Sequence, residues 1–151
     1  MKRRERAAEA FLSDYNCAQA VTLAFADLMD VEEATALRMA SPFGGGMGRM
    51  REVCGAVSGM LLVLGDLYGY CEAQDTAGKK QLYKDIQDLA GAFRHRIGSI
   101  VCREILKNPP SDPNPTPRTE AFYANRPCVR MVMTAAELLE EFIEKHPPEG
   151  K

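Results

Sequence analysis

The chain has 151 residues, a mass of 16.7 kDa and a formal net charge of −2, with 19 Lys and Arg against 21 Asp and Glu. This length is sufficient for one domain with a buried core, so disulfides are not needed to stabilise it. The near balance of charges gives no general electrostatic reason to bind nucleic acid, and we exclude that class of function.

Apolar residues recur every three or four positions almost throughout the chain, and no stretch alternates with the two-residue period of a half-buried strand. We therefore predict an all-α fold, a single domain over residues 1–151 built as a bundle of about six or seven helices. The first helix is expected over about residues 3–12. A second apolar stripe runs from Cys17 to Leu28, with Asn16 as its N-cap.

Asp30 is predicted to cap the next helix, with Glu33 completing the reciprocal capping box and Pro42 ending it. A glycine-rich loop then leads into a stretch over about residues 49–68 that is apolar on almost all sides. A helix with this composition is covered by neighbours, so we expect it at the centre of the bundle.

A further helix carries a buried row from Leu82 to Ile97 and ends near Gly98, and Ser99 is predicted to cap a short successor. Residues 107–118 hold five of the nine prolines, which indicates a connector rather than a helix interior. Pro127 suits the first turn of the last helix, whose apolar stripe begins at Cys128.

Cysteines stand on or at the start of the apolar stripes of four different predicted helices. These four are Cys17, Cys54, Cys102 and Cys128. The bundle could bring their sulfurs together, although gaps of 37, 48 and 26 residues are not the paired spacing of zinc ribbons or ferredoxins. The alternative is that they are small apolar core residues. Cys71 follows a helix end and belongs to no stripe.

Residues 43–59 read FGGGMGRMREVCGAVSG, and NCAQAV precedes them at residues 16–21. Together with the downstream cysteines, these segments resemble the redox-active family that is named C_GCAxxG_C_C after its pattern. The family's four cysteines map onto Cys17, Cys54, Cys102 and Cys128, although Val53 stands where the label has a glycine. The resemblance implies a small helical protein with a redox or metal function.

Three hypotheses follow for the four thiols. Cys17, Cys102 and Cys128 fall in the first turn of their predicted helices, where the helix dipole favours a thiolate, and Cys54 lies about one turn into its own. Four buried thiolates need a compensating cation, so we expect these residues to hold an iron–sulfur cluster or zinc for electron transfer or redox sensing. A thiol–disulfide oxidoreductase using a spatial cysteine pair is the alternative. The third hypothesis is a non-enzymatic accessory module that binds a partner.

Glycines supply a second set of candidate site residues. The loop with Gly44, Gly45, Gly46 and Gly48, beside Arg49 and Arg51, could present backbone N–H groups to an anion or to a cluster. Gly55 and Gly59 lie four residues apart on one helix face, which permits close approach of a cofactor or of another helix. Sharp turning and close packing are the alternatives without a ligand.

The expected setting is cytoplasmic, without membrane insertion. The longest strictly apolar run covers residues 60–64, far below the roughly 20 residues of a membrane-spanning helix. The charged opening followed by Glu9 does not match a signal peptide. A redox partner of unknown identity is expected. The apolar residues near Met60 would also suit a homodimer, although a monomeric core explains them equally well.

Overall fold

The structure is a computed structural model that describes residues 1–149, and it confirms the all-α fold. Six of its helices have eight or more residues, in agreement with the expected bundle. The elements are α1 (Arg3–Leu12), α2 (Cys17–Ala24), η1 (Ala26–Leu28), α3 (Glu33–Ala40), η2 (Ser41–Phe43), α4 (Gly44–Met47), α5 (Gly55–Tyr68), α6 (Thr76–Ile97), α7 (Cys102–Ile105), α8 (Glu120–Asn125) and α9 (Cys128–Lys145). Within residues 1–149, no helix is both long and apolar enough to span a membrane.

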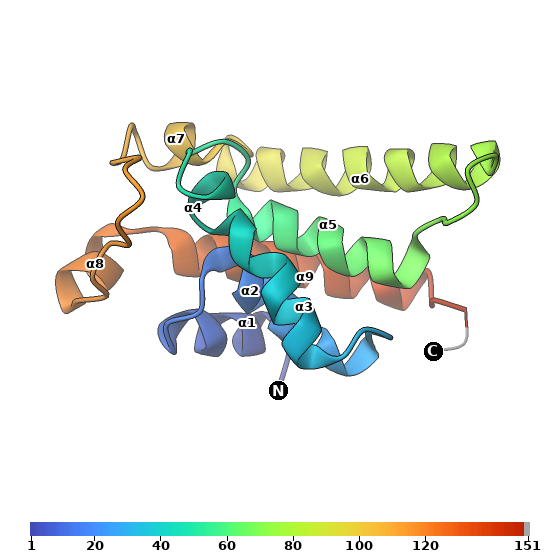
Figure 1. The fold of residues 1–151 in the computed structure, drawn as a ribbon, viewed down its shortest axis with the longest axis horizontal. Helices are drawn as coiled ribbons and strands as arrows, with labels where there is room; N and C mark the ends of the chain where they lie inside the picture. Colours follow the sequence, from blue (N-terminus) through green and yellow to red (C-terminus); the bar gives the residue numbers. More distant parts are fainter. Residues whose placement is uncertain (150–151) are drawn as a thin grey trace.

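The core lies where α1, α2, α5 and α9 pack against one another (Figure 1). Its largest fully buried side chains include Phe11, Phe25, Met60, Leu64 and Phe93. Burial of a large apolar side chain contributes about 1.5–3 kcal/mol, so this cluster is the main source of the fold's stability. Helix α5 is buried along most of its length, as expected for the central helix.

Helices α2 and α5 approach each other closely because α5 carries glycines on the facing side. A Cβ atom added to Gly59 would lie 2.6 Å from the carbonyl oxygen of Ala18, and one added to Gly55 would lie 3.1 Å from Cys17 Cβ. Close helix packing is therefore an observed role of this pair. As a result, the start of α2 lies directly beside the start of α5.

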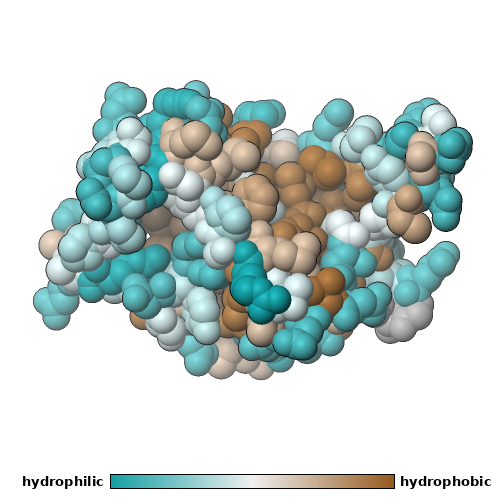
Figure 2. All heavy atoms as spheres, in the orientation of Figure 1, coloured by the Kyte–Doolittle hydropathy of each residue, from teal (hydrophilic) through white to brown (hydrophobic). Residues whose placement is uncertain are grey.

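Helix α6 is the most exposed long helix. It runs along one edge of the molecule and contacts α5 and α9 (Figure 1). Only Leu89 and Phe93 of its 22 residues are buried. Figure 2 shows apolar side chains gathered over α5, in the band between α3 and α6.

The start of the central helix differs from the prediction. Helix α5 begins at Gly55, and residues 49–54 are not helical. Arg49 and Arg51 have φ values of +64° and +61°, which an α-helix does not accept. Val53 instead forms an isolated antiparallel bridge with Val101. Cys54 is therefore the N-cap of α5 and not a residue one turn inside it.

Smaller corrections concern helix ends. Helix α3 has Glu32 at its N-cap, so Asp30 does not cap it, and the backbone N–H of Asp30 donates to Asp66 Oδ2 at 2.9 Å. The N-cap of α7 is Val101, whose N–H donates to Ser99 Oγ at 3.0 Å.

The elements around residues 25–28 and 119–127 also differ from the prediction. Helix α2 ends at Ala24, and residues 26–28 form a 3₁₀ turn. Helix α8, capped by the Thr119 side chain, was not predicted. Pro127 is the N-cap of α9 rather than a residue of its first turn.

Candidate functional site

Each of the four predicted site cysteines lies at the start of a helix. Cys17, Cys102 and Cys128 are the first residues of α2, α7 and α9, and Cys54 is the N-cap of α5. All four line one small cavity of about 30 Å³. Helix N-termini favour negative charge, so this arrangement directs four positive dipole ends toward sulfur. The exposed Cys71, between α5 and α6, does not line this cavity.

Main-chain contacts hold Cys54 and Cys102 together. The N–H of Cys54 donates to the Ile100 carbonyl at 2.7 Å, and the N–H of Cys102 donates to the Glu52 carbonyl at 2.6 Å. These two bonds flank the bridge between Val53 and Val101. Two cysteines 48 positions apart are thus fixed on neighbouring backbone segments.

Cys17 and Cys128 form an asymmetric pair at the starts of α2 and α9. Hydrogen bonding to Cys128 and burial raise the pKa of Cys17 well above its ordinary value. The same hydrogen bond, helped by the charges of Arg126, Arg118 and Arg51, lowers the pKa of Cys128 to about 7 against the effect of burial. Above about pH 7, Cys128 therefore carries the negative charge and Cys17 is the proton donor.

Cys54 and Cys102 have a different environment. Burial raises the pKa of Cys54 to about 12, although the backbone N–H groups of Ala56 and Val57 act in the opposite direction. Burial also raises the pKa of Cys102, and Arg51 opposes it by donating from Nη1 to Cys102 Sγ at 3.7 Å. These two cysteines are therefore protonated at neutral pH.

A larger pocket of about 340 Å³ opens beside Cys17 and Cys128. Four arginines line it, namely Arg49, Arg51, Arg118 and Arg126. Arg49 is anchored to the Pro-rich segment by bonds to the Asp112 carbonyl at 2.7 Å and Thr116 Oγ1 at 2.8 Å. Arg118 donates to the Phe11 and Tyr15 carbonyls, both at 3.1 Å.

Sequence reasoning recognised Arg49 and Arg51 beside the glycine loop but missed Arg118 and Arg126. Arg118 directly follows the Pro-rich connector, and Arg126 stands two residues before Cys128. Basic residues beside a candidate thiol were the available signal, because a nearby cation favours the thiolate. The fold of the connector was needed to show that both arginines reach the same pocket.

The predicted glycines are divided between the two cavities. Gly44, Gly45 and Gly48 line the arginine pocket, Gly45 and Gly46 line the cysteine cavity, and Gly55 lines the latter as well. Gly46 is the most constrained. Its φ is +68°, and a Cβ added to it would lie only 2.6 Å from Cys102 Cβ and 2.8 Å from Arg51 Cα. Gly59 lines neither cavity.

The four cysteines do not form a ready ligand set for a metal. Across residues 1–149, no group of three or more His, Cys, Asp or Glu side chains is placed to hold a metal ion. The sulfurs share a cavity, and ligation would require their side chains to reorient. His95 is exposed on α6.

Comparisons with known proteins add one relationship. No curated protein and no solved structure matches the chain. A family model matches residues 15–142, which include every cysteine described above. The chain therefore belongs to the family described as "Putative redox-active protein (C_GCAxxG_C_C)".

Proposed function

We propose that this protein is a thiol–disulfide redox protein whose reactive unit is the Cys17–Cys128 pair. The observation that carries the proposal is the division of pKa values within this pair, with Cys128 lowered to about 7 and Cys17 raised. At neutral pH the pair thus combines a thiolate nucleophile with a thiol that holds the proton needed later.

The proposed reaction is exchange with an external disulfide. The Cys128 thiolate attacks one sulfur of that disulfide, its S–S bond breaks, and the first thiolate leaves. Cys17 then loses its proton, and its sulfur attacks Cys128 in the mixed disulfide, which releases the second thiolate. The Cys17 proton passes to the first thiolate to leave and a solvent proton neutralises the second, so the external disulfide gains two electrons and becomes two thiols while Cys17 and Cys128 become a disulfide.

Cys54 and Cys102 have no chemical step in this proposal. Both are buried and protonated, because burial raises their pKa values. Cys128 is also buried, at 8% relative exposure, but it lines the arginine pocket and has a lowered pKa, whereas Cys54 and Cys102 do not line that pocket. A buried thiol whose pKa is raised behaves as a small apolar side chain. Their role here is to fill the space behind the reactive pair.

The test is to equilibrate the reduced protein with glutathione buffers of graded potential and to map cross-links by peptide mass spectrometry. We expect loss of two free thiols and a Cys17–Cys128 cross-link. Cys17→Ser and Cys128→Ser should each abolish the two-electron couple, whereas the matched variant Cys54→Ser should keep it. A couple that survives Cys128→Ser, or a Cys54–Cys102 cross-link in its place, contradicts the proposal.

A metal centre is the second candidate, and the observation in its favour is that all four cysteines line one cavity. As they stand, the side chains do not form a ligand set. If they reorient, Cys17, Cys54, Cys102 and Cys128 would hold either zinc or an iron–sulfur cluster. Such a cluster supplies one-electron transfer, whereas zinc supplies structural stability.

The two candidates differ most clearly at Cys54. A four-sulfur centre requires it as much as Cys128, whereas the disulfide couple does not. Purification without oxygen, followed by measurement of iron, sulfide and zinc per chain and of visible absorption, tests the metal candidate. Stoichiometric metal that is lost in Cys54→Ser supports it. Metal-free protein with an intact two-electron couple eliminates it.

A further inference from the structure

The pocket of about 340 Å³ beside Cys17 and Cys128 has an excess of positive charge. Four arginines line it, and among residues 1–149 no Asp or Glu does. The nearest carboxylates lie at its margin, with Asp112 Oδ2 3.9 Å from Arg49 and Asp14 Oδ1 3.6 Å from Arg118. These carboxylate side chains are 52% and 75% exposed, so solvent screens them strongly.

Arg51 is the most informative of the four arginines. Its side chain is buried, with 4% relative exposure, and it lines both the arginine pocket and the cysteine cavity. Its Nε donates to the Pro110 carbonyl at 2.9 Å and its Nη1 donates to Cys102 Sγ at 3.7 Å. Its Nη2 has no hydrogen-bond partner within residues 1–149. A buried guanidinium with an unused donor is costly unless an acceptor occupies the site.

The other arginines support the same conclusion. The Arg126 side chain has no hydrogen bond or carboxylate partner in the described part of the chain and contacts the Phe122 ring, with its Cζ 5.1 Å from the ring centroid. Burial and the positive charges of Arg51 and Arg126 lower the pKa of Arg49. Like charges therefore crowd together here, which an anion would relieve.

We infer that the arginine pocket binds a small organic anion through phosphate-, sulfonate- or carboxylate-type oxygens, with Arg51 and Arg126 as the principal ligands. Phe122, which is half-buried, lines the same pocket and offers an apolar surface to the rest of the ligand. The volume lies in the usual range for small-molecule sites, about 300–1,000 Å³. Cys17 and Cys128 line this pocket too, so the bound anion lies next to the thiol pair.

The anion site stands apart from the thiol chemistry, because its ligands are arginines. Binding should therefore survive in a chain that carries both Cys17→Ser and Cys128→Ser. If the chain shows both the disulfide couple and anion binding, the inference deepens the proposed function, since the external disulfide would then be an anionic one. Loss of the two-electron couple with retained anion binding would overturn the proposed function alone.

The experiment is isothermal titration of the full chain with inorganic phosphate and with phenyl phosphate. We expect saturable binding of both probes, with phenyl phosphate tighter because its ring meets Phe122. Arg126→Gln should weaken phenyl phosphate binding by about tenfold, the usual cost of losing a charged hydrogen bond. Arg51→Met should weaken it at least as much.

Arg130→Gln is the matched control, since Arg130 is exposed on the same helix as Cys128 and donates only to the Arg96 carbonyl. It changes the net charge as Arg126→Gln does and should leave binding unaltered. If Arg51→Met fails to fold, Arg126→Gln alone decides the question, because the Arg126 side chain has no hydrogen bond within residues 1–149 that the substitution would remove. Absence of saturable binding, or an equal loss from Arg130→Gln, would overturn the inference.

Discussion

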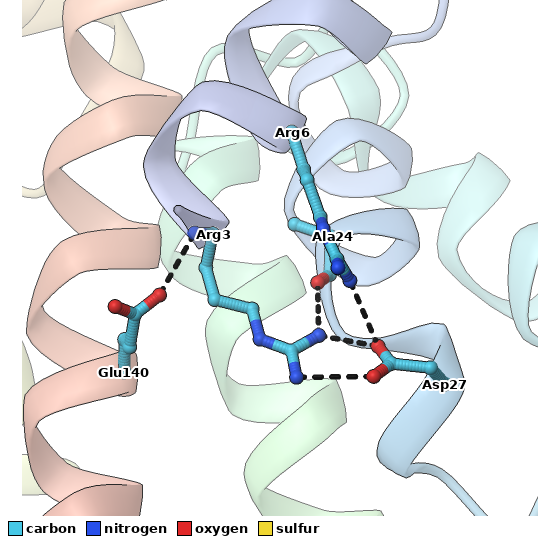
Figure 3. A network of polar contacts seen from close by, with 5 residues as sticks. All are labelled: Arg3, Arg6, Ala24, Asp27 and Glu140. Atoms are coloured by element: carbon cyan, nitrogen blue, oxygen red, sulfur yellow. Dashed lines mark hydrogen bonds and ion pairs between the residues drawn. The ribbon is translucent and has the colours of Figure 1, made fainter. Parts of the chain in front are cut away.

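Two clusters of arginines, one at the start of α1 and one in the arginine pocket, differ in whether carboxylates pair with them. At the start of α1, Arg3 forms a two-point contact with Asp27, donates to the Ala24 carbonyl at 2.8 Å, and is joined by Arg6 on the same carboxylate (Figure 3). The backbone N–H of Arg3 donates to Glu140 at 2.8 Å. In the arginine pocket, Arg51 and Arg126 have no carboxylate partner within residues 1–149.

The difference separates structural charge from charge available to a ligand. The contacts of Arg3 connect α1 to η1 and α9, so its positive charge is used within the fold. Backbone carbonyls position Arg49, Arg51 and Arg118 in the pocket and fix their direction without cancelling their charge. Predictions that alter one region and leave the other intact test this distinction.

The largest effect is expected from Gly46→Ala, on the pocket side. The alanine would have to adopt a left-handed backbone conformation at φ +68°, and its methyl group would collide with Cys102 Cβ and Arg51 Cα. Backbone strain and overpacking together should lower the free energy of unfolding by about 2–5 kcal/mol. Chemical denaturation monitored by circular dichroism measures this loss.

Gly65→Ala is the matched control, because a Cβ at this α5 position meets nothing within 4 Å. Here alanine should stabilise the helix by about 0.5–1 kcal/mol. Equal effects of the two substitutions would show that the tight contact at Gly46 is unimportant.

Arg126→Gln should raise the pKa of Cys128, since Arg126 is the first of three nearby cations that lower it. The thiolate is present above about pH 7 and is lost as the pH falls through that value. We expect alkylation of Cys128 at pH 7 to slow by about two- to tenfold. The rate of iodoacetamide labelling against pH measures this change. Arg3→Gln should leave that profile unchanged. A similar shift from both variants would contradict the claim that only the pocket arginines act on Cys128.

Arg3→Gln should lower the free energy of unfolding by about 1–2 kcal/mol, because it removes a backbone contact, a two-point ion pair and the stacking on Phe25. Arg6→Gln should cost less, about 0.5 kcal/mol, since Arg6 makes one contact with Asp27 at 3.3 Å and is partly exposed. Thermal and urea unfolding compare the two. A larger loss from Arg6→Gln than from Arg3→Gln would contradict this ranking.

The smallest effect concerns pH. Hydrogen bonding from Arg3 holds the pKa of Asp27 below its ordinary value of 3.8. A carboxyl group with a depressed pKa stabilises the fold above its unfolded value, and this contribution is lost as the pH falls through the folded value. The stability difference between the natural chain and Asp27→Asn should therefore be constant near neutrality and shrink below about pH 4. Urea unfolding at a series of pH values measures it, and a difference that grows on acidification would be contrary to expectation.

Much of the helical scaffold could be predicted from sequence. Asn16 caps α2 through its side chain, and Gly98 ends α6 in a left-handed conformation, because both residues carry local signals. The irregular path of residues 49–54 could not be predicted, since apolar periodicity continues across it and the bridge to Val101 is a tertiary contact.

The candidate site was predictable only in part. Cysteines on four separate stripes predicted that their helices meet at sulfur, and in the structure all four line one cavity. The division into a titrating pair and a protonated pair depends on burial and on Arg126 and Arg118. Arg118 ends the connector, which has no helical period, and Arg126 follows the short helix α8, so sequence pattern carries no information about their position.

The main-chain hydrogen bonds on either side of the Val53–Val101 bridge position Cys54 and Cys102 without using their sulfur atoms. The bonds that position Cys54 and Cys102 come from peptide groups, and no side chain takes part in them. Exchanging either thiol for a hydroxyl therefore leaves this part of the scaffold standing. Loss of bound metal in Cys54→Ser or Cys102→Ser can therefore be assigned to the missing sulfur, and unchanged thiol exchange in the same variants shows that these thiols take no part in it.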